Sequence, residues 1–179
     1  MSELKDTQNE NDDRQIAIDR VGVKALKFPL VVKDKGGDEQ PTVATVALAV
    51  DLPHHNKGTH MSRFIEVLNA HGNCLSVHDM AGLPGDLLKR LDAQRAYVEF
   101  LFPFFKSKPA PVTGNEGMMD YNVRFEIEAE KGGITDFIVT VMVPVATLCP
   151  CSKAISEYGA HNQRGVVTYS VRFRDPVWI

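Results

Sequence analysis

Apolar and polar residues alternate along several stretches of the chain, which is the pattern of β-strands that bury one face. The clearest stretch is residues 121–130, where every second residue is apolar, and residues 42–52 alternate large aliphatic side chains with small or polar ones. The same signal predicts further strands at residues 21–32, 97–105, 136–145 and 166–174. Glycine pairs at 36–37 and 132–133 predict tight turns, so neighbouring strands should pair as antiparallel hairpins.

Between the predicted strands at residues 42–52 and 97–105, apolar residues recur every three to four positions instead of every two. This spacing predicts two helices. Apolar residues at 61, 64, 65 and 68 form the stripe of an amphipathic helix that Thr59 can cap and Gly72 can close. A second helix should follow Pro84, with leucines at 87, 88 and 91 on one side. The order is ββααββ followed by two more strands, which predicts an α+β fold: antiparallel sheets with the helix pair packed on one face.

This order divides the chain into three parts. Residues 1–15 are polar and acidic and should form a disordered tail. Residues 16–131 should form the first ββααββ module, and residues 132–179 should be the opening strands of a second module. The second module lacks helices and closing strands, and Trp178 and Ile179 lack an evident partner. We therefore expect a fragment of a longer protein, or a protein that depends on another chain.

Composition is that of a soluble globular protein, with 44% hydrophobic and 24% charged residues. The formal net charge of −3 argues against a general nucleic-acid binder. No apolar run approaches the roughly 20 residues that cross a bilayer, and the polar N-terminus does not resemble a signal peptide. We therefore expect a cytoplasmic protein without membrane or nucleic-acid partners, in which the three cysteines stay reduced.

The segment at residues 147–165 combines Cys149, Cys151 and His161. Thiolate and imidazole are preferred zinc ligands, and at most three nearby ligands would leave an open, reactive site. Three interpretations stay open on spacing alone: a metal site, a packed loop, or a redox pair. A metal site could lower the pKa of bound water from 15.7 to about 7 and act as a hydrolase, whereas a thiol beside a cation could be a nucleophile. Lys153 and Arg164 could lower the thiol pKa or hold an anionic substrate.

A second candidate segment covers residues 54–64 and contains Lys57, His60 and Arg63. A helix that begins near Thr59 would offer free backbone N–H groups to an anion, with the three side chains around them. This arrangement predicts a phosphate-binding site, and the alternative is a set of solvated surface charges.

Four stretches of the chain resemble GTP cyclohydrolase I of the type IB family, an enzyme of bacterial folate synthesis. They are "DRVGVKALKFPL", "KGTHMSRF", "FPFFKSKPAPVTG" and "PVATLCPCSKAISEYGAHNQR", and the resemblance spans roughly residues 19–173. It implies the tunnelling fold, in which ββααββ modules assemble into barrels by oligomerisation. It also implies hydrolysis of GTP to 7,8-dihydroneopterin triphosphate and formate, the first step of tetrahydrofolate biosynthesis.

The resemblance implies roles for individual residues. Cys149 matches the metal-binding and catalytic cysteine, Cys151 the neighbouring thiol of the catalytic motif, and His161 a metal-binding histidine. The implied cofactor is a divalent metal ion, either zinc, manganese or iron. The implied partners are GTP and further copies of the chain, with a tetramer favoured; candidates to hold the triphosphate are Lys57, His60, Arg63, Lys153 and Arg164.

The chain departs from the family because further metal ligands, a glutamate and a second histidine, come from a part with no counterpart here. Two alternatives therefore remain. One is a non-catalytic or fragmentary tunnelling-fold module. The other is a tunnelling-fold nitrile reductase that uses a cysteine nucleophile and NADPH.

Overall fold

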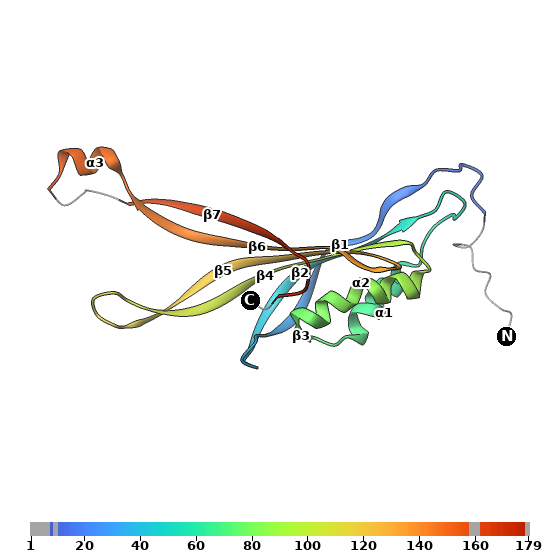
Figure 1. Ribbon diagram of the computed structural model, residues 1–179, viewed down its shortest axis with the longest axis horizontal. Helices are drawn as coiled ribbons and strands as arrows, with labels where there is room; N and C mark the ends of the chain where they lie inside the picture. The colour runs from blue at the N-terminus through green and yellow to red at the C-terminus, as the bar shows by residue number, and fades with distance from the viewer. Residues whose placement is uncertain (1–7, 9–10, 158–161, 178–179) are drawn as a thin grey trace.

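A computed structural model describes residues 8, 11–157 and 162–177 of the chain (Figure 1). The strands are β1 (Ile18–Lys33), β2 (Glu39–Leu52), β3 (Cys74–Ser76), β4 (Arg95–Pro109), β5 (Glu116–Glu130), β6 (Gly133–Leu148) and β7 (Asn162–Phe173). The helices are α1 (Met61–Ala70), α2 (Val77–Leu91) and α3 (Pro150–Ile155). None of the described helices is long and apolar enough to cross a membrane.

The strands form one sheet in the order β3-β1-β2-β4-β5-β6-β7. All neighbours are antiparallel except β1 and β3, which are parallel. The six predicted strands are confirmed as β1, β2 and β4 to β7. The prediction missed β3, because its three residues are too few to show a period.

The core lies between the sheet and the pair α1 and α2, which cover one face (Figure 1). Alternate residues of each central strand face the helices, and Val46, Val98, Phe100 and Phe125 are fully buried there. Phe64 is the fully buried aromatic that α1 contributes. The α+β class and the ββααββ order of a tunnelling-fold module are confirmed. The expected division of the chain at residues 15 and 131 stays a prediction.

The starts of both helices differ from the prediction. α2 begins at Val77, seven residues before Pro84, which lies buried inside the helix. The reason is a capping box: the Ser76 hydroxyl accepts a hydrogen bond from the Asp79 N–H, and the Asp79 carboxylate accepts one from the Ser76 N–H. The residue that caps α1 is His60 rather than Thr59, and its side chain makes no capping hydrogen bond.

The capping box of α2 gives a stability prediction. Ser76→Ala should lower the free energy of unfolding by about 1 kcal/mol. Hydrogen bonds from Ser76 lower the pKa of Asp79, so this stabilisation is present above the usual carboxyl pKa and is lost as pH falls through the lowered folded value. Urea unfolding of wild type and Ser76→Ala between pH 3 and pH 7 measures both effects. Ser76→Thr, which keeps the hydroxyl, is the control; an equal loss in both variants would contradict the capping role.

Beyond the helices the sheet divides into two ribbons (Figure 1). Pairing of β5 with β6 ends at Asn122 and Met142, but β4 and β5 stay paired as far as Pro109. The strands β6 and β7 stay paired as far as Leu148, and α3 lies at the tip of their ribbon. On β7, Val167 and Tyr169 are 52% and 65% exposed in a single chain, whereas Phe173 packs against the core. This end of the molecule therefore presents apolar surface that a single chain does not cover.

Candidate functional site

Cys149 lies immediately before α3, and Cys151 is the second residue of this helix. Cys149 is the N-cap residue, followed by Pro150 at a position where a missing N–H costs nothing. Its side chain is buried, with 8% of its surface exposed, whereas Cys151 is exposed. Lys153 is also exposed and closes the first turn, where its backbone N–H donates to the Cys149 carbonyl at 3.1 Å. The two thiols of the motif therefore have different environments and suit different roles.

The environment of Cys149 favours its thiolate. Hydrogen bonding from the backbone and side chain of Ser152, and from Cys151, lowers the pKa of Cys149 against the opposing effect of burial. Ser152 is itself buried, so this surrounding is built into the tip of the ribbon. The thiolate is the form that binds metal ions and the form that acts as a nucleophile. Cys149 is therefore the better candidate of the two for a metal ligand.

The other predicted ligand, His161, lies outside the described residues. Arg164 is on β7 opposite Ala146, three residues before Cys149 on the neighbouring strand. The described part of the chain holds no cluster of three or more metal-ligating side chains. A buried sulfur whose anionic form is stabilised nevertheless fits one position in the coordination of a divalent ion. His161 and donors from elsewhere would have to complete it.

Lys57 lies in the loop before α1, His60 is the N-cap residue of α1, and Arg63 is in its first turn. The first turn contains no acidic side chain. No carboxylate of this turn therefore offsets the partial positive charge of its free backbone N–H groups. A small hollow here is lined by His60 and Arg63 together with Asp51 and Asp92. The carboxylate of Asp51 accepts hydrogen bonds from two backbone N–H groups at the start of β4. The group can therefore attract an anion, although carboxylates lie beside it.

The two groups of predicted site residues lie at opposite ends of the sheet (Figure 1). Val46, Phe100, Phe125 and Val139 form one row across β2, β4, β5 and β6. β2 runs six residues beyond this row toward the α1 loop, and Cys149 lies ten residues beyond it in the opposite direction. At 3.3 Å per residue the separation along the strands is on the order of 50 Å. One chain therefore does not bring both groups to one ligand.

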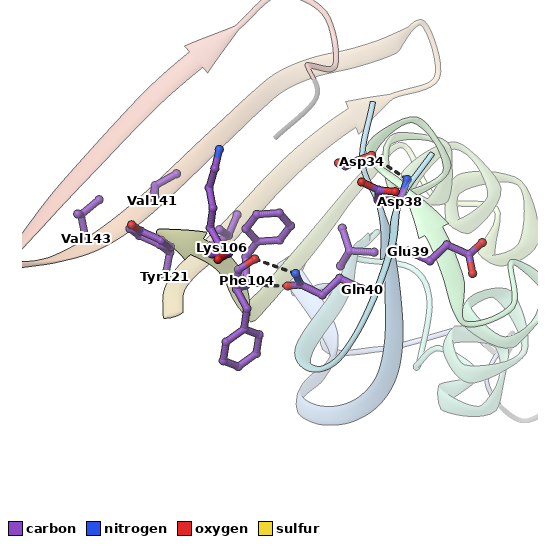
Figure 2. Close-up of a pocket in the computed structure, with 13 residues that line it drawn as sticks. Asp34, Asp38, Glu39, Gln40, Phe104, Lys106, Tyr121, Val141 and Val143 are labelled. Atoms are coloured by element: carbon purple, nitrogen blue, oxygen red, sulfur yellow. Dashed lines mark hydrogen bonds between the residues drawn. The ribbon is translucent and has the colours of Figure 1, made fainter. Parts of the chain in front are cut away.

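Sequence reasoning missed a hollow of about 510 Å³ at the end of the sheet where the ribbons begin (Figure 2). Phe104, Tyr121 and Val141 give it an apolar wall, and Lys106 lies at its side. Acidic residues of the turn between β1 and β2 lie at the other side. Its β4 residues belong to the stretch "FPFFKSKPAPVTG".

The hollow exists because β2 and β4 stop pairing through their backbones after Thr45 and Leu101. Pro103, which has no N–H, follows in β4, and side chains of β2 replace the missing backbone bonds. Thr42 Oγ1 donates to the Pro103 carbonyl at 2.9 Å. Gln40 then bonds both the N–H and the carbonyl of Phe105, at 2.7 and 2.8 Å (Figure 2). Only the proline was a signal for this opening in the sequence.

Comparison with known proteins now decides the family. The sequence profile described as "Type I GTP cyclohydrolase folE2" matches residues 4–179, nearly the whole chain. The chain belongs to the type I GTP cyclohydrolase FolE2 family. The resemblance in the four sequence stretches is thereby confirmed at the level of the family.

Curated FolE2 proteins from several bacteria are similar over the full chain. GTP cyclohydrolase FolE2 of Akkermansia muciniphila is 65% identical over 181 residues, which cover 100% of this chain and 69% of that protein. Those of Azoarcus sp. strain BH72 and Methylobacillus flagellatus are each 49% identical over 176 residues, which cover 98% of this chain and 65% and 66% of those proteins. The chain thus spans about two thirds of the length of the FolE2 relatives it matches.

Proposed function

We propose that the chain carries out the chemistry of GTP cyclohydrolase I: hydrolysis of GTP to 7,8-dihydroneopterin triphosphate and formate, in the first step of tetrahydrofolate biosynthesis. The observation that supports this most directly is the buried Cys149, with its lowered pKa, inside a chain that matches the FolE2 family over residues 4–179. A reduced thiol and a GTP substrate favour a cytoplasmic location for this activity.

In this proposal Cys149 and His161 hold a divalent metal ion, either zinc, manganese or iron. The ion would supply a hydroxide equivalent at neutral pH by lowering the pKa of bound water. Water adds to C8 of the guanine, a proton reaches the departing ring nitrogen, and the C8–N bond breaks. A second water then hydrolyses the resulting formamide and frees C8 as formate, and ring closure with the ribose carbons returns one water.

Cys151 is our candidate for the proton transfer, because it is exposed at the first turn of α3 beside Cys149. Lys153 and Arg164 are candidates to hold the triphosphate near the ribbon tip. Lys57, His60 and Arg63 are candidates to hold it at the start of α1. Oxygen atoms of a triphosphate accept charge-assisted hydrogen bonds from all of these groups.

The test of the proposed function is formate release from GTP, followed on the chain after chelation and after addition of zinc or manganese. We expect no formate from the chelated protein and recovery with either metal. Formate release that does not respond to chelation would contradict the metal role. Oxidation of NADPH with a nitrile substrate, without formate release, would instead indicate the reductase.

The distance between the two groups leads us to propose a homo-oligomer, with a tetramer favoured, in which one copy supplies Cys149 and another supplies Arg63. Each site would then combine α3 of one copy with the α1 loop of a neighbouring copy. The exposed side chains of Val167 and Tyr169 on β7 support association with another copy.

Mixed oligomers give a direct prediction. Cys149→Ala and Arg63→Ala should each be inactive or strongly impaired alone, and co-expression should restore part of the activity, because mixed interfaces then contain one intact site. Formate release by the co-purified mixture measures this. The matched control is the chain that carries both substitutions, Cys149→Ala and Arg63→Ala, expressed alone, because every site then lacks both groups. A mixture no more active than its parents would show that both groups do not serve one shared site.

A further inference from the structure

Asp12 is buried, although it belongs to the stretch predicted to be a tail. Asp12 has 8% of its surface exposed, and no other Asp, Glu, Lys or Arg among the described residues is buried. Its neighbour Asp13 is exposed. Ionised carboxylates are seldom buried without a structural or functional reason. The proposed chemistry does not use Asp12 directly, so its burial needs another explanation.

Gln8 and residues 11–15, here called the N-terminal strap, lie along the loop at residues 53–58 that leads into α1 (Figure 1). Two backbone hydrogen bonds join strap and loop: the Asp12 N–H donates to the His55 carbonyl at 3.0 Å, and the Gly58 N–H donates to the Gln8 carbonyl at 3.2 Å. The first of them belongs to an antiparallel bridge that pairs Asn11 with Asn56. The loop therefore has partners on both sides of Lys57.

The Asp12 side chain fixes the conformation of the strap. Its Oδ1 accepts hydrogen bonds from the Arg14 backbone N–H at 3.2 Å and from Arg14 Nε at 3.0 Å. The Gln15 amide donates to the Asp12 carbonyl at 2.6 Å. Hydrogen bonding from Arg14 lowers the pKa of Asp12, and Lys57 adds attraction. Asp12 is therefore ionised at neutral pH and turns the chain back on itself where it meets the loop.

We propose that Asp12 is a positioning residue for the triphosphate, acting through the N-terminal strap to hold Lys57 and the start of α1 in the geometry that binds the anion. The inference rests on the proposed function. Its reason is that α1 does not fix this loop by itself: the His60 side chain makes no capping hydrogen bond, and the first turn contains no acidic side chain. Within the loop the Asn56 N–H donates to the Pro53 carbonyl at 3.0 Å, and the contacts with the strap add to this turn on both sides of Lys57.

The experiment compares Asp12→Ala with Asp13→Ala, which removes the same charge from the exposed neighbour. Calorimetric titration with GTP and with inorganic tripolyphosphate should give a Kd about 10-fold higher for Asp12→Ala, the loss expected when one hydrogen bond to a charged group is no longer held in place. Asp13→Ala should bind like wild type. Asp12→Asn keeps an oxygen for the Arg14 N–H and should recover part of the affinity.

Hydrogen exchange supplies a readout that does not depend on substrate. The backbone amides of residues 12 and 58 should exchange faster in Asp12→Ala, while those of the central strands should not change, because no residue of the strap belongs to the hydrophobic core. Unchanged Kd values with faster exchange would overturn the positioning role and leave Asp12 as a purely structural residue. Equal exchange and equal Kd in all variants would overturn it too. A wild-type chain that binds neither probe would instead contradict the proposed function, and the inference would fall with it.

Discussion

Cys149→Ala is expected to abolish formate release from GTP. The variant removes the buried sulfur whose thiolate the start of α3 stabilises. Losing a group that merely orients a metal ligand typically costs about 10- to 100-fold in metal affinity or activity, so losing a ligand should cost more than that. The rate of formate release from GTP at saturating zinc measures the loss, and the protein should still fold, because α3 lies at the tip of the ribbon rather than in the core.

Metal binding separates this prediction from a merely inactive protein. With cobalt in place of zinc, the wild-type chain should show sulfur-to-metal charge-transfer absorption, and Cys149→Ala should lose most of it. Cys74→Ala is the matched control, because that thiol lies in β3, outside the ribbon that carries α3. Cys151→Ala should keep the absorption but lose activity, because the group proposed for proton transfer is missing. Retained absorption in Cys149→Ala would show that this sulfur is not a ligand.

Strands and helices were predictable from the sequence wherever apolar residues recurred over a long enough stretch, every second residue in strands and every three to four residues in helices. β5 is the best case, because each of its buried residues, from Val123 to Ala129, stands at the predicted alternate position. The start of α2 was missed although Ser76 and Asp79 stand at the spacing of a capping box, because Pro84 gave a competing start signal. The N-terminal strap gave no signal, since backbone hydrogen bonds hold it to the loop.

The candidate site was predictable in its residue types and not in its arrangement. The spacing of Cys149 and Cys151 pointed to thiolate chemistry, but the burial of one and the exposure of the other depend on the turn that begins α3. The basic residues before α1 were expected to meet the same substrate. Their separation from α3 depends on how far β6 and β7 extend past the helices, which no local pattern encodes. A site that combines both groups, as we propose, therefore needs a second copy of the chain.

Phe125→Ala should produce the largest loss of stability among single substitutions in the sheet that we consider. Phe125 is fully buried at the centre of the core, and its ring centroid lies 5.9 Å from those of Phe102 and Phe137. Truncation of a buried phenylalanine costs about 3–5 kcal/mol, because transfer energy is lost and the rings around the cavity relax only in part. Domains are stabilised by only about 5–15 kcal/mol in total, so the variant should be close to unfolding at physiological temperature.

Urea unfolding followed by circular dichroism tests this prediction through the midpoint at unchanged slope. Phe125→Leu should cost much less, because most of the apolar volume is kept. Phe105→Ala is the control on the same sheet: that ring is 38% exposed at the ribbon end, so its loss should change stability by only about 1 kcal/mol or less. The ranking matters more than the absolute values, because it tests whether the core ends where the ribbons begin. Equal losses for Phe105→Ala and Phe125→Ala would mean that the ribbons are as firmly packed as the sheet beneath the helices, and that another copy of the chain covers them in solution.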